Sequence, residues 1–307
     1  MGGGRAGVHR SRHDLPRGAG RRRVDVSPGP LPRPPRQSGR RGRGVARHRA
    51  ALRRHALGQV RRRAPRRGGG EGDGRLTPFT VGIPVFDEEA IVVDNTQRLL
   101  DFLDGLGREY EVIIGSNGST DSTTALGVDL SRRFKPVTFF HLPQRGVGLA
   151  FREFVRRARH PLLVSLDMDL SVDLSFVPAA LDLLETHDIV VGSKKLGNQN
   201  RALFRRLGSE LFLRAVRLLL GIAYEDYSIA AKAFRVATLR RFIDRVNVGS
   251  SYVLEICYLT HRTGGRVVQV PVSCEDWRAS KFNLLHEAFY KYRHLLGLWL
   301  RYRRGVA

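Results

Sequence analysis

Residues 161–171 read PLLVSLDMDLS, a short apolar run followed directly by two carboxylates. The run at 162–166 has the length and composition of a buried strand. Asp167 and Asp169 follow at a spacing of two, which in an extended segment turns both side chains to one face. Two carboxylates this close repel each other unless a cation offsets their charge. The stretch therefore predicts a strand that ends in a pair of ligands for Mg²⁺ or Mn²⁺.

Further short apolar runs lie on both sides of this stretch, at Phe79–Val85, 111–115, Val137–Leu142 and 189–192. Between the first two runs, apolar residues recur at helical spacing over 92–106, and helix formers fill 150–159. Strands that alternate with helices predict an α/β fold, a mostly parallel sheet with helices on both faces.

The first 75 residues differ from the rest of the chain in composition. They contain 22 Arg, no Lys and four acidic residues, so 18 of the 24 net positive charges lie there. Because they offer too little apolar surface to offset the entropy of ordering a backbone, we expect 1–75 to be disordered and 76–307 to fold. A tail that binds RNA or lipid, a solvated tail, and upstream sequence translated from a misplaced start codon all fit this composition.

The composition of 76–307 excludes several classes of protein. Its net charge of +6 is ordinary for its length and does not indicate a nucleic-acid partner. Two cysteines, Cys257 and Cys274, are too few for a disulfide framework or a four-cysteine zinc site. The sequence contains no run of 18 apolar residues, the length that would predict a membrane-spanning helix. The N-terminus also lacks the apolar segment of a signal peptide. We therefore expect a cytoplasmic protein.

Polar residues end four of the apolar runs, and ligands of open α/β sheets bind at the carboxyl ends of strands. These endings are PVFDEE at 84–89, SNGSTD at 116–121, the Asp167 and Asp169 pair, and GSKK at 192–195. The alternative for Asp87 and Ser119 is that they merely cap the helices that follow. Together, the four endings predict one ligand site along an edge of the sheet.

In this order the motifs resemble those of family-2 glycosyltransferases of the GT-A fold, over about residues 79–285. PVFDEE is similar to the family's P-x-Y-N-E-E start, SNGSTDST to its D-D-G-S-T-D-x-T turn, and DMDLS to its D-x-D-L metal motif. Within the family, the chain looks like the polyprenyl-phosphate (dolichyl-phosphate) mannose or glucose synthases. The resemblance implies a Rossmann-like GT-A sheet and an enzyme that uses a nucleotide sugar.

The resemblance also implies roles for residues of the first half. Those it places against the nucleotide sugar are Pro84, Phe86, Glu88, Ser116, Asp121 and Asp167. Asp167 and Asp169 would hold the metal, with Asp169 a catalytic residue. Ser116 departs from the family, which has there an Asp that tends to contact the base. A serine can hydrogen-bond a base edge but adds no charge, so the nucleobase stays open.

The second half resembles the lipid-phosphate branch of the family. Lys194 stands where relatives have Arg, and Arg205 with Ser209 is similar to their R-x-x-x-S phosphate pair on one helical face. The resemblance makes Lys194 and Arg205 catalytic residues that hold the acceptor phosphate. The further phosphate-binding residues that it implies are Ser209, Lys232, Arg278, Ser280 and Lys281. YEDYSIAAKAFR at 224–235 is similar to the family's D-x-S-G-F-R-A-F-R run, which adds Asp226 and Ser228, and DWRASKF at 276–282 is similar to its R-x-x-G-x-S-K motif. The glycine of each motif is missing here.

The chemistry implied is an inverting, in-line displacement at the anomeric carbon, with the metal stabilising the departing nucleoside diphosphate. A phosphate monoester, with a second pKa of about 6, is largely dianionic at pH 7 and attacks without a protein base. This agrees with the histidines, none of which falls in a motif; His141, for example, reads as a core or surface residue. A sugar hydroxyl acceptor would instead need a carboxylate near Asp226.

Residues 283–304 predict an amphipathic helix. Its apolar face consists of Leu285, Ala288, Phe289, Tyr292, Leu295, Leu296 and Trp299. The same pattern serves a helix on an anionic membrane surface and a helix packed on the protein's own core. With a lipid acceptor, we expect a peripheral protein at the inner face of the membrane, with a separate membrane protein as an optional anchor.

The sequence thus predicts metal-dependent transfer of a hexose from a nucleotide sugar to a polyprenyl phosphate, with GDP-mannose the first donor to test and UDP-glucose the second. Two alternatives stay open. One is a family-2 glycosyltransferase with a sugar hydroxyl as acceptor. The other is a non-catalytic nucleotide-sugar- or RNA-binding protein in which Ser116 marks loss of the site. The intact Glu88, Asp167, Asp169 and Arg205 argue against the latter.

Overall fold

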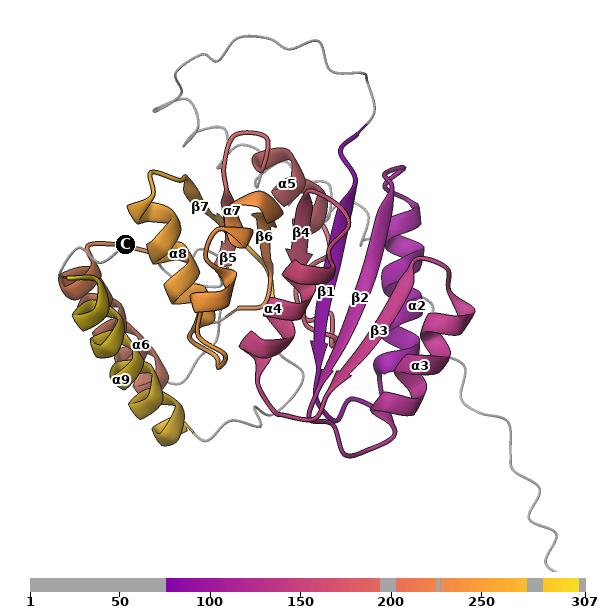
Figure 1. The fold of residues 1–307 in the computed structure, drawn as a ribbon, viewed down its shortest axis with the longest axis horizontal. Helices are drawn as coiled ribbons and strands as arrows, with labels where there is room; N and C mark the ends of the chain where they lie inside the picture. Colours follow the sequence, from indigo (N-terminus) through magenta and orange to yellow (C-terminus); the bar gives the residue numbers. More distant parts are fainter. Residues whose placement is uncertain (1–75, 194–202, 225–226, 228, 275–283, 304–307) are drawn as a thin grey trace, which may run out of the picture. The chain divides into compact units, whose positions relative to one another are not determined.

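A computed structural model describes residues 76–193, 203–224, 227, 229–274 and 284–303. Within them, strands form one seven-stranded sheet in the order β3-β2-β1-β4-β6-β5-β7 (Figure 1). The strands are β1 Phe79–Val85, β2 Tyr110–Asn117, β3 Val137–Leu142, β4 Leu162–Ser165, β5 Ile189–Ser193, β6 Lys232–Arg235 and β7 Val267–Pro271. The N-terminal tail predicted at 1–75 lies outside the described residues.

The helices are α2 Val92–Asp104, α3 Thr123–Arg133, α4 Val147–Arg157, α5 Phe176–Leu183, α6 Leu203–Leu220, α7 Val236–Arg240, η1 Ile243–Arg245, α8 Tyr252–Arg262 and α9 Leu284–Tyr302. Buried side chains form two cores, one on each face of the sheet. Helices α2, α3 and α5 contribute to the first core. Helices α4, α6, α7, α8 and α9 contribute to the second. The predicted α/β fold with helices on both faces is therefore confirmed.

The inner strands β1, β2 and β4 are nearly continuous apolar runs because helices cover both of their faces, whereas β3, at the edge of the sheet, is partly exposed. Gly82 in β1 and Gly115 in β2 allow α4 to lie close to the sheet. A Cβ atom at Gly82 would lie 2.8 Å from the ring of Phe154, and one at Gly115 would lie equally near the same ring. The close fit holds Phe154, in the second half of α4, directly against β1 and β2.

The five predicted strands are present, and their pairings with neighbours are parallel except at one place. There, β6 lies between β4 and β5 and runs antiparallel to both. Its residues, KAFR, belong to a segment that the sequence had suggested as a phosphate-binding motif. Strand β6 became visible only in the tertiary structure, because it is four residues long and pairs with strands far away in the chain.

Helix α9 packs on the protein's own core, as one interpretation of its amphipathic pattern predicts, and its contact with a membrane stays a prediction. Leu295, Leu298 and Tyr302 are buried in the second core, so one face packs on the protein itself. Phe289 and Leu296 are exposed on another face. Of the apolar face predicted from the sequence, Leu295 therefore faces the core while Phe289 and Leu296 face solvent. None of the described helices is long and apolar enough to cross a membrane.

Candidate functional site

The loops that follow β1 and β2 are joined by reciprocal hydrogen bonds. The backbone N–H of Asp87 donates to Ser119 Oγ at 3.2 Å, and that of Thr120 donates to Asp87 Oδ1 at 2.8 Å. The N–H of Glu88 donates to Thr123 Oγ1 at 2.8 Å. Asp87 adopts a left-handed backbone with φ 51°. Its carboxylate thus holds the neighbouring loop, and the strained turn keeps the strand ends together.

The capping alternative for Asp87 and Ser119 is wrong. Helix α2 begins after Ile91 and α3 begins after Ser122, and neither N-cap makes a side-chain hydrogen bond to its helix. The two residues lie several positions before these helices. They bind the opposite loop instead, so their side chains support the edge of the sheet where a ligand would lie.

Asp121 takes part in the same set of hydrogen bonds between the loops that follow β1 and β2. Its carboxylate accepts the N–H of Glu89 at 3.2 Å and the N–H of Thr123 at 2.9 Å. Burial works to raise the pKa of Asp121, but hydrogen bonds from Thr123 and Glu89 outweigh it and lower the pKa. Glu89 returns the contact by accepting the N–H of Ser122 at 2.9 Å. Asp121 is therefore an ionised brace between the loops, and its place beside the nucleotide stays a prediction.

Ser116, at the end of β2, is completely buried (0% exposed). Its hydroxyl lies 2.9 Å from Ser119 Oγ and 3.0 Å from Nδ1 of His141, which is exposed. That Ser116 itself touches a base stays a prediction. Its hydroxyl faces other side chains and not the solvent.

Phe86 and Arg145 stack at the end of β1. The guanidinium carbon of Arg145 lies 4.0 Å from the centroid of the Phe86 ring. Asn117 connects the same parts, because its Nδ2 donates to Val85 O at 2.9 Å and its Oδ1 accepts the N–H of Gly146 at 3.2 Å. An Asp, as the family has at this position, could accept the second bond but could not donate the first. The amide therefore fixes the loop that carries Arg145.

Asp167 and Asp169 lie in a turn, so the predicted extended conformation is wrong. The N–H of Leu170 donates to Asp167 O at 3.1 Å, and that of Ser171 donates to Asp169 Oδ1 at 2.9 Å. Met168, between the two carboxylates, is buried in the first core, whereas Asp167 is exposed and Asp169 is half-buried. The pair still reaches the surface while the residue between them anchors the turn.

This pair fits a divalent cation that is shared with a phosphate. In the described part of the chain, no group of three or more His, Cys, Asp or Glu residues is placed to hold a metal ion. Mg²⁺ is usually bound by one or two carboxylates and retains positions for water and substrate phosphates, so it does not need such a cage. The donor set therefore suits a metal completed by a diphosphate.

The residues predicted to hold the acceptor are only partly described. Those outside the described residues are Lys194, Asp226, Ser228, Arg278, Ser280 and Lys281. Arg205 lies in α6, of which the structure describes the backbone at that point, and Ser209 is half-buried one turn later. Lys232 opens β6 and is 1% exposed, so it lies beneath the surface beside Ser165 of β4. The acceptor roles stay predictions.

Sequence reasoning missed His141 and Arg145 as neighbours of the site. His141 lies at the end of β3 and Arg145 comes shortly after it. The candidate residues come from the ends of the other four predicted strands. The signal was present, because β3 had been predicted and carboxyl ends of parallel strands meet at one edge. His141 lies opposite Ser116 in the β2–β3 register.

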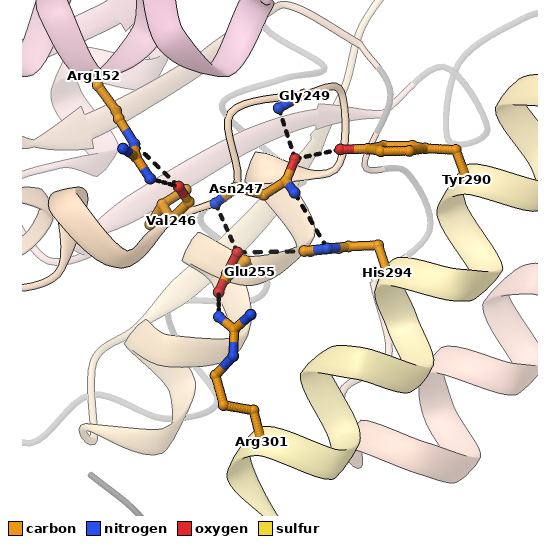
Figure 2. Close-up of polar contacts among 8 residues, drawn as sticks. All are labelled: Arg152, Val246, Asn247, Gly249, Glu255, Tyr290, His294 and Arg301. Carbon is orange, nitrogen blue, oxygen red and sulfur yellow. Dashed lines mark hydrogen bonds and ion pairs between the residues drawn. The ribbon is translucent and has the colours of Figure 1, made fainter.

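A second polar network joins α8, α9 and the loop at 246–249, which contacts α4 (Figure 2). Buried Glu255 of α8 accepts the N–H of Asn247 at 2.8 Å and a hydrogen bond from Arg301 of α9 at 3.1 Å. Burial raises the pKa of Glu255 despite these partners. The N–H of Leu149 in α4 donates to Val248 O at 3.2 Å. The loop at 246–249 thus links α8 and α9 to the helix that follows Arg145.

Comparisons with known proteins agree with this geometry. Residues 80–246 match the family model described as glycosyl transferase family 2. A curated relative, the undecaprenyl-phosphate 4-deoxy-4-formamido-L-arabinose transferase of Aeromonas hydrophila, is 27% identical over 212 residues, 67% of this chain and 63% of the relative. The match thus spans less than two thirds of that relative's length.

Solved structures of glucosyl-3-phosphoglycerate synthase from Mycobacterium tuberculosis share the fold. The complex with phosphoglyceric acid has a TM-score of 0.52 at 20% identity, over 73% of this chain and 79% of that one. The complex with Mn²⁺, UDP-glucose and phosphoglyceric acid has a TM-score of 0.52 at 18% identity, with the same coverage. At this identity the likeness establishes the GT-A fold alone.

Proposed function

Because the chain belongs to glycosyl transferase family 2, we propose that this glycosyltransferase moves a hexose from a nucleotide sugar to a polyprenyl phosphate, with inversion at the anomeric carbon. The observation that carries the proposal is the joining of the ends of β1, β2 and β4 at one edge of the sheet, with Asp167 and Asp169 reaching the surface there. The name of the Aeromonas relative, which acts on undecaprenyl phosphate, supports the acceptor class. GDP-mannose is the first donor to test and UDP-glucose the second.

Asp167 and Asp169 would hold the Mg²⁺ or Mn²⁺. When bound, such an ion supplies positive charge that stabilises the departing nucleoside diphosphate. The turn of Asp167–Leu170 holds the backbone of the pair, and the hydrogen bond from the N–H of Ser171 orients the carboxylate of Asp169. A mycobacterial structural neighbour is described with both Mn²⁺ and UDP-glucose, which supports a metal of this kind.

The acceptor side needs positive charge more than it needs a base. A polyprenyl phosphate is largely dianionic at pH 7, so its oxygen attacks without losing a proton to the protein. Lys194 and Arg205 are proposed to orient it, since a guanidinium can give a phosphate two parallel hydrogen bonds. Ser209 lies one turn after Arg205 on α6 and would complete the contact.

We also propose that α6 and α9 bring the enzyme to a lipid surface. They pack against each other, with the rings of Phe212 and Tyr292 5.4 Å apart. Leu218 of α6 and Phe289 of α9 are 85% and 72% exposed. Exposed arginines of the same helices, Arg214 among them, would add attraction to anionic lipid, about 1 kcal/mol for each. Such binding would make the protein peripheral at the cytoplasmic face, with or without a membrane anchor protein.

The test is a transfer assay with a panel of donors. Purified protein with Mg²⁺ or Mn²⁺ is given a short-chain polyprenyl phosphate and labelled nucleotide sugars, and the lipid product is separated and identified. Formation of a hexosyl phospholipid from one donor supports the proposal. Transfer to sugar hydroxyls only would favour the alternative acceptor. Turnover of no nucleotide sugar, together with salt-sensitive RNA binding by 76–307, would overturn the proposal.

A further inference from the structure

Ser116 and His141 form a pair at the edge of the proposed donor site. They lie opposite each other where β2 and β3 run parallel, with Ser116 Oγ 3.0 Å from His141 Nδ1. Ser116 is completely buried, whereas His141 is exposed. Paired residues of neighbouring strands share one face of a sheet. The imidazole is therefore the outer member of the pair and the one that a ligand can reach.

The hydrogen bonds of Ser116 bear on which nitrogen of His141 carries the proton, because the role of Nδ1 depends on the tautomer of the ring. When the Ser116 hydroxyl donates to Ser119 Oγ, 2.9 Å away, its oxygen accepts from His141. In that arrangement Nδ1 carries the hydrogen and donates it. Thr124 Oγ1, 3.3 Å from the same nitrogen, can share this hydrogen. A neutral imidazole with hydrogen on Nδ1 has a free lone pair on Nε2.

Nε2 is the part of the ring that remains for a ligand. No side chain of the described residues forms a hydrogen bond with it, whereas Nδ1 is held by Ser116 and Thr124. The ring lies near the end of β3, beside the loops that the hydrogen bond between Asp87 and Ser119 joins. His141 therefore presents a fixed acceptor at the edge of the sheet where the nucleotide is proposed to lie.

We propose that His141 reads the nucleobase, with Nε2 accepting a hydrogen bond from the imino N–H of uracil or guanine. The inference rests on the proposed function, in which the donor is a nucleotide sugar. Uracil N3 and guanine N1 carry a hydrogen, whereas cytosine N3 and adenine N1 are acceptors. Two lone pairs would face each other with the latter bases, and an unpaired polar group in a site lowers affinity sharply. The pair thus selects the class of base.

The discriminating experiment compares UDP with CDP, whose rings differ in the donor and acceptor pattern at N3 and C4. Isothermal titration of the full chain with each nucleotide, in the presence of Mg²⁺, should give about tenfold or more tighter binding of UDP. GDP and ADP provide the same comparison for purines. His141→Ala should bring UDP and CDP to similar affinity, and His141→Asp, which restores an acceptor, should retain the preference for UDP.

Two further variants separate position from stability. His261→Ala changes an exposed histidine at the end of α8 and should leave both affinities unchanged. Ser116→Ala removes the acceptor for Nδ1, so the preference for UDP should weaken while the circular dichroism spectrum stays that of the wild type. Each variant is compared at equal folded fraction, which is measured by urea unfolding.

Two results overturn the inference and leave the proposed function intact. One is equal affinity of the wild type for UDP and CDP. The other is a His141→Ala variant that keeps its preference, or that loses both affinities equally and so places His141 on the ribose or phosphates. If the wild type binds none of the four nucleotides, the proposed function fails, and the inference fails with it.

Discussion

Tyr290 of α9 donates a hydrogen bond of 2.5 Å to Oδ1 of Asn247, a residue of the loop between η1 and α8 (Figure 2). The same oxygen accepts the N–H of Gly249 at 2.7 Å, so the side chain of one helix organises the loop. That loop in turn holds the start of α4 through Val248 and Leu149. Removing α9 would therefore disturb the edge of the sheet where the nucleotide sugar is proposed to bind. For this reason, membrane binding must be tested by substitutions on the surface of the helix.

Leu218→Glu combined with Phe289→Glu should weaken binding to vesicles that contain anionic phosphatidylglycerol. Both side chains are exposed, so the fold should tolerate the change, while two carboxylates oppose contact with an anionic leaflet. Flotation of protein with the vesicles measures the effect. Leu76→Glu, at an exposed leucine before β1, is the control and should bind as the wild type does. Undiminished flotation of the double variant would remove the lipid surface from α6 and α9.

Glu255→Ala should destabilise the protein by about 2 kcal/mol, because it removes a buried carboxylate that accepts the N–H of half-buried Asn247 and a hydrogen bond from exposed Arg301. Urea unfolding gives the free energy. Asp129→Ala is the matched control, since its ion pair with Arg133 is exposed and should change stability by no more than about 0.5 kcal/mol. A similar small effect at Glu255 would contradict the role of the network.

Glu111 should make stability fall in acid. Burial tends to raise the pKa of Glu111, but hydrogen bonds from Arg159 and Thr80 outweigh it and hold the pKa below its usual value. The unfolded chain then binds a proton more readily, so this contribution is present above the unfolded pKa of about 4.3 and is lost as the pH falls through the folded pKa.

Glu111→Gln therefore should be less stable than the wild type at pH 7 by about 2 kcal/mol, and its stability should fall less steeply between about pH 5 and 3. Unfolding curves across that range measure both effects. Parallel pH profiles for the two proteins would show that Glu111 is not a source of the acid sensitivity.

Asp169→Asn should reduce metal-dependent transfer by about a hundredfold or more with the fold intact, because an amide is a neutral and poorer ligand for a divalent cation. Initial rates over a range of Mn²⁺ concentrations measure the loss. Asp173→Asn is the control: Asp173 Oδ1 accepts the N–H of Ser175 as Asp169 Oδ1 accepts that of Ser171, but it lies outside the proposed pair. Normal turnover of Asp169→Asn would reject the metal assignment.

Arg205→Lys should raise the concentration of polyprenyl phosphate needed for half-maximal rate by about ten- to a hundredfold, the cost of a lost charged hydrogen bond. The lysine keeps the charge and loses the planar fork. Donor affinity should change little. Arg217→Lys, on the exposed surface later in α6, is the control. If the need for donor and acceptor rises equally, Arg205 belongs on the diphosphate instead.

The sequence alone determined the α/β fold and the positions of its first strands. Phe79–Val85 and Leu162–Ser165 are nearly continuous apolar runs, and burial on both faces of a parallel sheet leaves few other structures for such runs. The same reasoning placed Asp167 and Asp169 at a strand end. These features are local, so composition and spacing suffice to predict them.

Only the tertiary structure decided which residues share the site edge. Ser116 and His141 are 25 positions apart and meet because β2 and β3 pair in one particular register, which no local pattern encodes. The exchange of hydrogen bonds between Asp87 and Ser119, which had looked like helix caps, depends in the same way on two loops meeting. Contacts between distant segments follow from how strands pair and helices pack, and the sequence states neither directly.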